Sequence, residues 1–571
     1  MERDGERFFC YTHVMNKQCT KCETTFQVTD EDLAFYKRIS PTFNGVTYDV
    51  PAPNYCPECR FQRRAIHRNQ IYLNVRKADN SGEQVFSVWP PKTPFPVYDN
   101  EYYVSDNWNA LDYGREVDFN RPFLEQLQEL FFEVPRPARS VLANENSDYV
   151  NNSHYCKDSY LCFGVLEAEN CMGLDMCWYH QDLMEGTLSF NCELCYDLTS
   201  CKGCYGVQSS QFCTDCKDSY FLMNCRNCTN CFGCVNLRHS EYCMFNEQLT
   251  KEEYERRMAD INLSSYDVRN QVQQRCFEFF KQHPRPHMST VNAEDVTGNY
   301  INDSKSVHDS FLINGSEDLK YCYFMNTNVK DSMDVTLYGN NCELLYEDVV
   351  CGSNVVNVLF SVYCIDSVSD LFYCNHCERS SNLFGCASVV NSEYCILNKK
   401  YTKEEYEALV PKIIEHMKAN GEWGEFFPIS FATMPYNQTI AQRSFPLTKQ
   451  AAETQGYHWY ENDALSIDES KLDDFVDSLP ETNDPLTFKC QTTGRPFRVT
   501  SAEIAKCKQM NVPLPRTTYD TRMNDRYHML GERALYNHTC AKTGKPIKTT
   551  IPPDSGWIVW DKDVYEQEFS G

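Results

Sequence analysis

Two Cys-x-x-Cys motifs near the amino terminus have the residue types and the spacing of a metal site. Cys19 and Cys22 form the first motif, and Cys56 and Cys59 form the second after thirty-three intervening residues. Four thiolates from two such motifs complete a tetrahedral shell around Zn²⁺ and leave no open coordination position. We therefore predict one structural zinc ion at these four cysteines. The spacing alone leaves an iron–sulfur centre or free thiols as alternatives.

A cluster of basic residues follows the second motif directly. Arg60, Arg63, Arg64, His67 and Arg68 lie within nine residues. On a helix, all of them except Arg63 share one face, which could contact nucleic-acid phosphates. The other interpretation is that they pair with carboxylates of this chain or of a partner protein. We favour pairing because the net charge of −26 opposes the approach of nucleic acid.

A second copy of this region lies near the carboxyl terminus and has lost most of its thiols. The segment that begins at Cys19 recurs from Cys490. The positions of the other three cysteines are occupied by Thr493, Thr518 and Thr521. Because three of four ligands are missing, no metal site is predicted there. The copy still retains Arg522 and Arg526, which supports the pairing interpretation of the arginines.

The middle of the chain is a tandem repeat with a different arrangement of cysteines. The segment around Cys243 recurs around Cys395, and both copies close with the sequence TKEEYE. Between Cys156 and Cys243, all fifteen cysteines lie at residue numbers divisible by three. Helices repeat about every 3.6 residues and strands every 2, so a register of three indicates short extended segments separated by corners. This pattern predicts a β-solenoid whose stacked coils bury a column of small side chains.

The central cysteines could also serve other chemistry. Several of them form Cys-x-x-Cys pairs, a spacing that can direct two thiolates at one metal ion. In the second copy, however, Leu345 matches Cys195 and Ser380 matches Cys228. A packed core tolerates such substitutions, and a ligand set does not. We therefore favour buried structural thiols over metal ligands, and both over redox-active thiols or disulfides.

These repeats predict the fold class and the domain organisation. A chain of 571 residues exceeds what one hydrophobic core usually holds. We expect a mainly β protein with a few helices, in which tandem cysteine-rich β-solenoid modules are flanked by zinc-ribbon-like terminal modules. The predicted segments are the ribbon-like module with the intact site at 1–117, two modules of a helix plus a solenoid repeat at 118–266 and 267–425, a connecting segment at 426–480 and the degenerate ribbon-like module at 481–571.

The sequence shows no sign of export or of membrane insertion. Its start has alternating charges in place of an apolar signal segment, and no apolar run reaches the length of a membrane helix. We therefore expect a cytoplasmic protein without a membrane partner. A reducing compartment disfavours a disulfide framework for the 32 cysteines.

Several motifs together carry a resemblance to other proteins. They are FCYTHVMNKQCTKCETTF, CPECRFQRR, the NSEYC and TKEEYE repeats and the MPYNQT and SFPLTK segments. Over nearly its whole length the chain resembles a family of uncharacterised, cysteine-rich proteins from uncultivated bacteria of the candidate phyla. The resemblance implies zinc-ribbon ends and a repetitive middle, and it implies no established activity.

Three functional hypotheses follow from these features. The leading one is a non-enzymatic, zinc-binding scaffold or protein-interaction repeat protein with an unidentified protein partner. The first alternative is a nucleic-acid-associated zinc-ribbon factor that uses Arg60, Arg63, Arg64 and Arg68. The second is a thiol redox protein, which requires accessible thiolates of low pKa. No phosphate-binding loop, zinc-protease helix or serine-nucleophile elbow points to a named enzyme, and we predict no catalytic residue.

Overall fold

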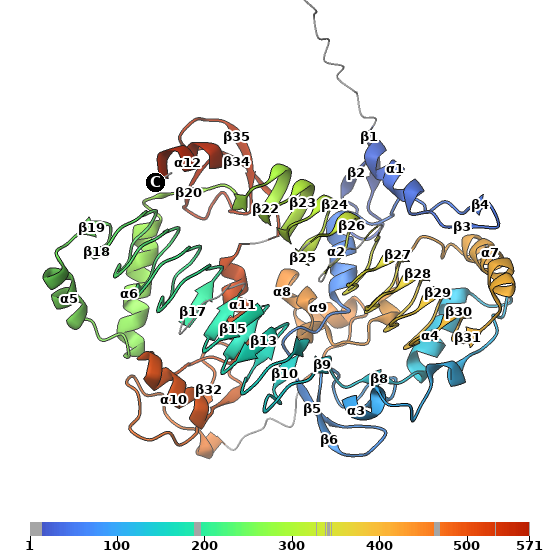
Figure 1. Cartoon of the computed structure of the whole chain (residues 1–571), viewed down its shortest axis with the longest axis horizontal. Coiled ribbons are helices and arrows are strands. Elements are labelled where there is room, and N and C mark those ends of the chain that lie inside the picture. The colour runs from blue at the N-terminus through green and yellow to red at the C-terminus, as the bar shows by residue number, and fades with distance from the viewer. Residues whose placement is uncertain are drawn as a thin grey trace, which may run out of the picture. The chain divides into compact units, whose positions relative to one another are not determined.

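The computed structural model (Figure 1) describes residues 14–569, apart from 177, 188–195, 327, 337–338, 340–342, 344, 462–468 and 532. The chain divides into two compact units, each assembled from three separate segments. Unit 1 consists of Met1–Arg68, Lys92–Arg136 and Thr290–His458, and unit 2 consists of Asn69–Pro91, Pro137–Ser289 and Trp459–Gly571. The predicted segment 1–117 thus contributes residues to both units.

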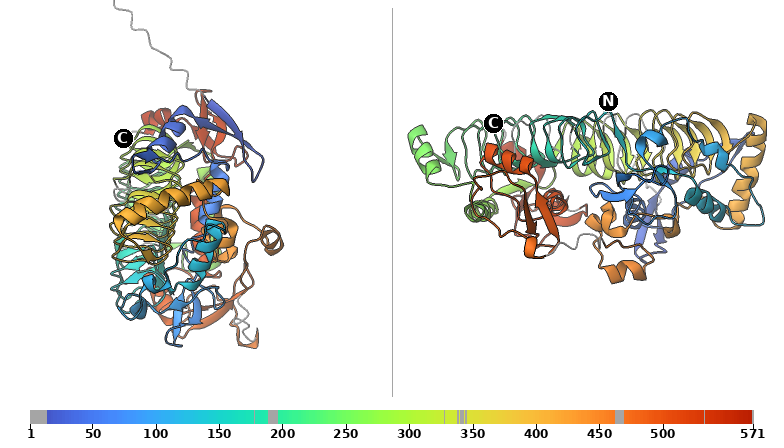
Figure 2. Two further views of the ribbon diagram at one scale, coloured as in Figure 1. Left: turned by 90° about the vertical axis from the view of Figure 1, so that its right-hand side faces the viewer. Right: turned by 90° about the horizontal axis from the view of Figure 1, so that it is seen from below.

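The solenoid of unit 2 is a stack of short parallel strands (Figures 1 and 2). One ladder contains β10 (Val150–Asn151), β12 (Cys162–Phe163), β14 (Met172–Asp175), β16 (Met184–Thr187) and β17 (Tyr196–Thr199). The other contains β9 (Val141–Leu142), β11 (Ser153–His154), β13 (Leu166–Glu169) and β15 (Trp178–Gln181). The following coils pair through single parallel bridges and end at the hairpin of β18 (Cys243–Met244) and β19 (Glu247–Gln248).

Each coil of this solenoid has four short sides. Parallel bridges join residues twelve positions apart, as in the ladder Lys202, Thr214, Arg226 and Arg238. Every third residue turns a corner with a positive φ, between 43° and 53° at Asp215, Asp218, Phe221, Asn224 and Asn227. Left-handed conformations cost free energy for residues other than glycine, and asparagine and aspartate tolerate them best. The triplet spacing of the cysteines is therefore the spacing between corners.

The remaining residue of each triplet points inward, and between Cys201 and Cys243 it is cysteine, serine, valine or leucine. Cys216 donates its thiol hydrogen to the carbonyl oxygens of Thr214 and Cys225, each at 3.5 Å. At another inward position, Ser210 donates to the carbonyl oxygen of Gln208 and accepts from the amide of Leu222, each at 2.9 Å. Cysteine and serine suit this position because they are small and also satisfy backbone groups that the narrow core hides from water. All 27 cysteines among the described residues are free thiols, and of these Cys22 alone is exposed.

The solenoid of unit 1 is built on the same plan with a less regular coil length. Bridges span 12 residues at Phe311 and Tyr323, 13 at Tyr346 and Leu359, and 12 again at Ser381 and Glu393. Its strands are β21 (Thr290–Val291), β22 (Glu294–Asn302), β23 (Lys305–Asn314), β24 (Glu317–Lys320), β25 (Tyr323–Asn326), β26 (Lys330–Met333), β27 (Val356–Leu359), β28 (Ser369–Phe372), β29 (Ser381–Phe384), β30 (Glu393–Ile396) and β31 (Lys399–Lys400).

The rest of unit 1 comprises a ribbon-like module and several helices. The module contains a hairpin of β1 (Val14–Gln18) and β2 (Thr25–Thr29), helix α1 (Asp30–Arg38), a hairpin of β3 (Thr42–Phe43) and β4 (Val46–Thr47), and helix α2 (Pro57–Ala65). The other elements are β7 (Val97–Tyr98), α3 (Asn100–Tyr103), α4 (Phe123–Glu133), α7 (Lys403–Ala419), α8 (Ile440–Ser444), α9 (Lys449–Thr454) and the first residue of β8 (Arg136–Pro137).

Unit 2 contains the matching module near the carboxyl terminus. A hairpin of β32 (Leu486–Lys489) and β33 (Pro496–Val499) precedes α10 (Ser501–Met510) and α11 (Tyr519–Met529). Thr29 before α1 and Thr500 before α10 both form a capping box with the acidic residue three positions later, so the local sequence repeats its helix start. The other elements are β5 (Asn74–Lys77), β6 (Gln84–Ser87), α5 (Lys251–Ala259), α6 (Tyr266–Phe280), β20 (Pro284–Pro286), β34 (Tyr536–Thr539), β35 (Pro546–Thr549), β36 (Ile558–Trp560) and α12 (Lys562–Phe569).

The predicted fold class is confirmed. The described residues form a mainly β protein with a few helices, in which two solenoids carry the central cysteines and hairpin-and-helix modules come from the two ends of the chain. Among the described residues, no helix combines the length and the apolar character that a membrane crossing requires.

We expect Cys225→Phe to destabilise unit 2 by about 1–3 kcal/mol, because overpacking forces side chains from their preferred rotamers. Cys225 is fully buried, and the inward residues from Cys201 to Cys243 are cysteine, serine, valine and leucine. Cys225→Ser is the matched control, since it retains the size and a donor toward the carbonyl oxygen of Cys234. Urea unfolding followed by circular dichroism would measure both. Equal stability of the two variants would contradict a narrow core.

Candidate metal centre

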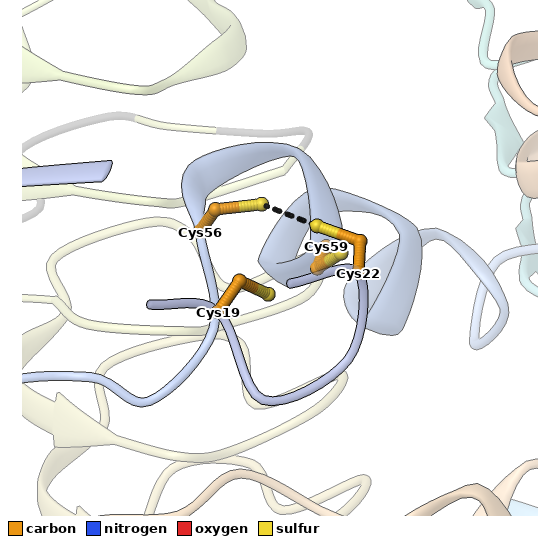
Figure 3. A group of neighbouring side chains, drawn as sticks. All are labelled: Cys19, Cys22, Cys56 and Cys59. Carbon is orange, nitrogen blue, oxygen red and sulfur yellow. Dashed lines mark hydrogen bonds between the residues drawn. The ribbon is translucent and has the colours of Figure 1, made fainter. Parts of the chain in front are cut away.

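The four predicted ligands lie in two turns that the ribbon-like module of unit 1 brings together (Figure 3). Cys19 and Cys22 lie in the turn between β1 and β2. Cys56 is the residue before α2, and Cys59 lies in the first turn of that helix. Pro57 occupies the first helical position, where its missing N–H would have no partner within the helix. The hairpin and the helix start thus present two thiols each to a common point.

The distances between the sulfur atoms suit a single metal ion. One ligand atom from each of the four cysteines lies within 4.8 Å of all the others. Cys22 Sγ and Cys56 Sγ are 3.7 Å apart. Four bonds of the usual Zn–S length in a tetrahedron place neighbouring sulfurs about 3.8 Å apart. Within the part of the chain that is described, no other group of three or more His, Cys, Asp or Glu side chains is this close.

The surroundings of Cys19, Cys22 and Cys56 favour the deprotonated form that binds metal, whereas the hydrogen bond that Cys59 donates to Cys56, together with burial, raises the pKa of the Cys59 thiol. Burial raises the pKa of the Cys19 thiol, but hydrogen bonds from the backbone N–H groups of Cys56, Cys22 and Lys21 outweigh this and bring the pKa below its usual value. A hydrogen bond from the Cys59 thiol lowers the pKa of Cys56 to about 6. Because the thiolate is the ligand, both shifts favour metal binding at neutral pH.

The arrangement has the properties of a structural site. Four protein ligands fill a tetrahedral shell, so no position is left for a water molecule or a substrate. Cys19, Cys56 and Cys59 are buried, whereas Cys22 is exposed. A bound ion would join the hairpin to α2 and would be reached from the side of Cys22. This four-cysteine group could hold a metal ion, and its chemistry would be to cross-link the module.

The arginines that follow the site are buried among carboxylates of unit 1. Arg60 donates from Nε to Asp334 Oδ2 at 2.6 Å. Arg64 lies 3.4 Å from Asp334 Oδ1 and donates from Nε to the hydroxyl oxygen of Thr336 at 2.9 Å. The exposed fraction is 1% for Arg60 and 0% for both Arg64 and the Asp334 side chain. Two charges of α2 therefore share one carboxylate of the solenoid.

Arg63 has a second carboxylate partner on the same solenoid. It contacts Glu347 Oε1 at 2.5 Å and Glu425 Oε2 at 3.2 Å. Burial lowers the pKa of Arg63, but Glu347 outweighs burial and raises it, so the guanidinium stays charged. Arg68 is 4% exposed and lies over the ring of Tyr363. All four arginines predicted as a contact surface are thus enclosed within unit 1.

Asp334 and Glu347 were not anticipated from the sequence. They turn equivalent corners of successive coils, with φ values of 67° and 52°, where the coil length is 13 residues. Exposed corners elsewhere also carry aspartate and asparagine. Residue type therefore did not distinguish the buried carboxylates. The sequence did contain one signal, because Asp334 and Glu347 are 13 residues apart. This spacing predicts stacked carboxylates only when the coil length at this point is known to be 13 residues.

Hydrogen bonds replace the thiol cluster in the matching module of unit 2. The hydroxyl oxygens of Thr518 and Thr521 are 2.9 Å apart. The amide of Thr493 donates to Cys490 Sγ at 3.4 Å. Arg495 donates to Thr518 at 3.2 Å and also pairs with Asp520. The module therefore keeps its hairpin and its helix together without a ligand set.

The helix of this second module is seated on its solenoid in the same manner. Arg522, which matches Arg60, donates from Nε to Glu185 Oε1 at 2.6 Å. Arg526, which matches Arg64, pairs with the same carboxylate and donates to the carbonyl oxygen of Gly173. In both units, therefore, two arginines of a ribbon-like module share one solenoid carboxylate.

Comparison of the chain with protein-family models, with curated proteins and with solved structures gives no match. The resemblance to cysteine-rich proteins of the candidate phyla stays a prediction. The chemistry of the site therefore follows from its own geometry, and the internal repeat provides the nearest structural comparison.

Replacing Asp334 should test the buried pairing. Asp334→Ala leaves two buried guanidinium groups without their carboxylate, and we expect it to lower the free energy of unfolding by about 3–5 kcal/mol. The control is Asp331→Ala in β26, which removes the exposed ion pair with Arg38 and should cost no more than about 1 kcal/mol. Chemical unfolding measures both variants. Similar losses would contradict a special role for the buried charges.

Proposed function

We propose that the chain is a non-enzymatic scaffold in which one zinc ion stabilises the ribbon-like module of unit 1 and the solenoids offer a repetitive surface to a protein partner. The observation that carries this proposal is the closed set of four thiols, all within 4.8 Å of one another. Such a set suits zinc, which favours tetrahedral sulfur coordination and needs no redox partner. A site without an open position supports structure and gives no support to catalysis.

The solenoids support the scaffold role. In each triplet the inward residue builds the core, and where it is cysteine or serine it also hydrogen bonds to the backbone, so the other two positions can vary wherever no module covers the coil. Stacked repeats of this kind form extended surfaces with regularly spaced side chains. The partner surface is thus proposed to run along the coils, with the ribbon-like modules packed against them.

Neither alternative gains support from the contacts. A nucleic-acid role depends on Arg60, Arg63 and Arg64, whose charges are buried against Asp334 and Glu347. A redox role depends on accessible thiolates, and 26 of the 27 described thiols are buried. The burial that stabilises the core thus withdraws these groups from solvent.

Elemental analysis of protein purified under reducing, anaerobic conditions tests the metal. We expect about one zinc per chain, held by the four thiolates. The Cys19→Ser, Cys56→Ser double variant should lose it because two ligands are removed. Iron in place of zinc, or metal that persists in the variant, would contradict the proposed site.

Restoring the missing ligands in unit 2 provides a gain-of-function test. We expect the triple variant Thr493→Cys, Thr518→Cys, Thr521→Cys, which completes a set with Cys490, to bind a second zinc ion. The hydroxyl contact of 2.9 Å between Thr518 and Thr521 indicates that these side chains already lie together. The double variant without Thr493→Cys is the control. A triple variant that binds a single zinc would show that the two modules differ in more than their ligands.

A further inference from the structure

Helix α2 connects the candidate metal site to the buried arginine contacts with the solenoid. Cys56 precedes the helix and Cys59 lies in its first turn, so its amino-terminal end forms half of the candidate metal site. The very next residue, Arg60, and Arg63 and Arg64 in the following turn are buried in unit 1. A helix of nine residues is a stiff connector. Its position is therefore set from one end by the thiols and from its side by the carboxylates.

The arginine contacts demand accurate placement of this helix. Arg60, Arg64 and Asp334 are essentially removed from water, and the carboxylate of Glu347 is 0% exposed. Buried charges are favourable when their partners are held in good geometry, and a lost partner leaves an uncompensated charge. Movement of α2 by a small distance would thus weaken all three arginine contacts together.

The two modules differ in what holds the hairpin to the helix. In unit 2, the pair of Arg495 and Asp520 and the threonine hydroxyls make this connection without metal. In unit 1 the residue that matches Arg495 is Thr24, which cannot form the ion pair. Lys21 donates to the side-chain oxygen of Gln62 at 2.7 Å, the amide of Thr20 donates to the carbonyl oxygen of Asn54 at 3.0 Å, and the four thiols lie at the same junction. In unit 1, therefore, a potential metal-dependent cross-link lies where unit 2 has its ion pair of Arg495 and Asp520.

The metal-dependent link is also open to exchange. Cys22 is exposed, whereas its three companions are buried. A competing ligand in solution can attack the ion from the side of Cys22 without prior unfolding of the module. The position of the site at the surface therefore allows the ion to leave while the solenoid stays folded.

We propose that zinc occupancy controls the seating of α2 on the solenoid of unit 1. This inference rests on the proposed function and deepens it, because the ion becomes a reversible clamp in addition to a structural element. With zinc bound, α2 holds its arginines against Asp334 and Glu347. When zinc leaves, α2 is released from these carboxylates, whereas α11 stays seated on Glu185 in unit 2. The chain thereby contains a zinc-responsive module and a zinc-independent counterpart.

Hydrogen–deuterium exchange of the full chain tests the release. Zinc-loaded protein is compared with protein stripped by a zinc chelator, and zinc content is measured in both samples. On zinc removal, we expect faster exchange in α2 and in the solenoid segments 331–336 and 345–349, since local opening governs exchange. Exchange in α11 and β16 should stay unchanged. These two elements are the internal control for general loosening.

Thermodynamic reciprocity provides a second test. If zinc binding stabilises the contacts between α2 and the solenoid carboxylates, a substitution that weakens these contacts must weaken zinc binding by the same factor. We expect Glu347→Gln, which removes the charge that faces Arg63 and leaves all four thiols, to lower zinc affinity by roughly 5-fold or more. Competition with a chromophoric chelator measures the affinity. Glu185→Gln, the matched change in unit 2, should leave it unaltered.

The outcomes separate this inference from the proposed function. A chain that binds no zinc overturns both. One zinc per chain, with α2 equally protected in the loaded and the stripped protein, overturns the clamp and leaves the structural site intact. Equal loosening of α2 and α11 on zinc removal also overturns the clamp, because the response would not be confined to unit 1. Selective release of α2 together with the reciprocal loss of zinc affinity supports it.

Discussion

The four-sided coil is the constraint on which the rest of this protein depends. A corner at every third residue leaves one inward side chain per triplet, so a coil of twelve residues has a core only four side chains wide. Such a core excludes bulky residues and at the same time hides backbone carbonyl groups. Cysteine and serine meet both demands, because Cys216 and Ser210 fill the space and hydrogen bond to neighbouring coils. The high cysteine content of the solenoids follows from this geometry.

A stack of uniform coils offers few places to attach other modules, and buried charges mark those places. Asp334 and Glu347 in unit 1 and Glu185 in unit 2 each receive arginines from the helix of a ribbon-like module. A buried ion pair contributes more to specificity of position than to net stability, because desolvation offsets much of its attraction. The carboxylates thus define which coil each module occupies, while apolar packing supplies most of the stabilisation.

The repeated module shows two different sets of side chains at the place where the hairpin meets the helix. In unit 1, four thiols converge where the hairpin meets α2. In unit 2, threonine hydroxyls and the pair of Arg495 and Asp520 occupy the same place. Hydrogen bonds and ion pairs form whenever the module is folded, whereas a metal link depends on the ion. The two copies therefore differ in the chemistry that occupies this place: four thiols in unit 1, and hydroxyl groups with an ion pair in unit 2.

The sequence by itself determined the solenoid and the group of four thiols. Fifteen cysteines in a register of three require corners at that spacing, and two Cys-x-x-Cys motifs bring four thiols together through short local turns. Only the tertiary structure decided that the arginines of α2 are buried and which carboxylates they pair with. Arg60 and Arg64 meet Asp334, which lies 274 residues after Arg60 and 270 after Arg64, and a surface carboxylate and a buried one have the same residue type. Pairing across that distance depends on coil length and on the packing of α2, neither of which local periodicity specifies.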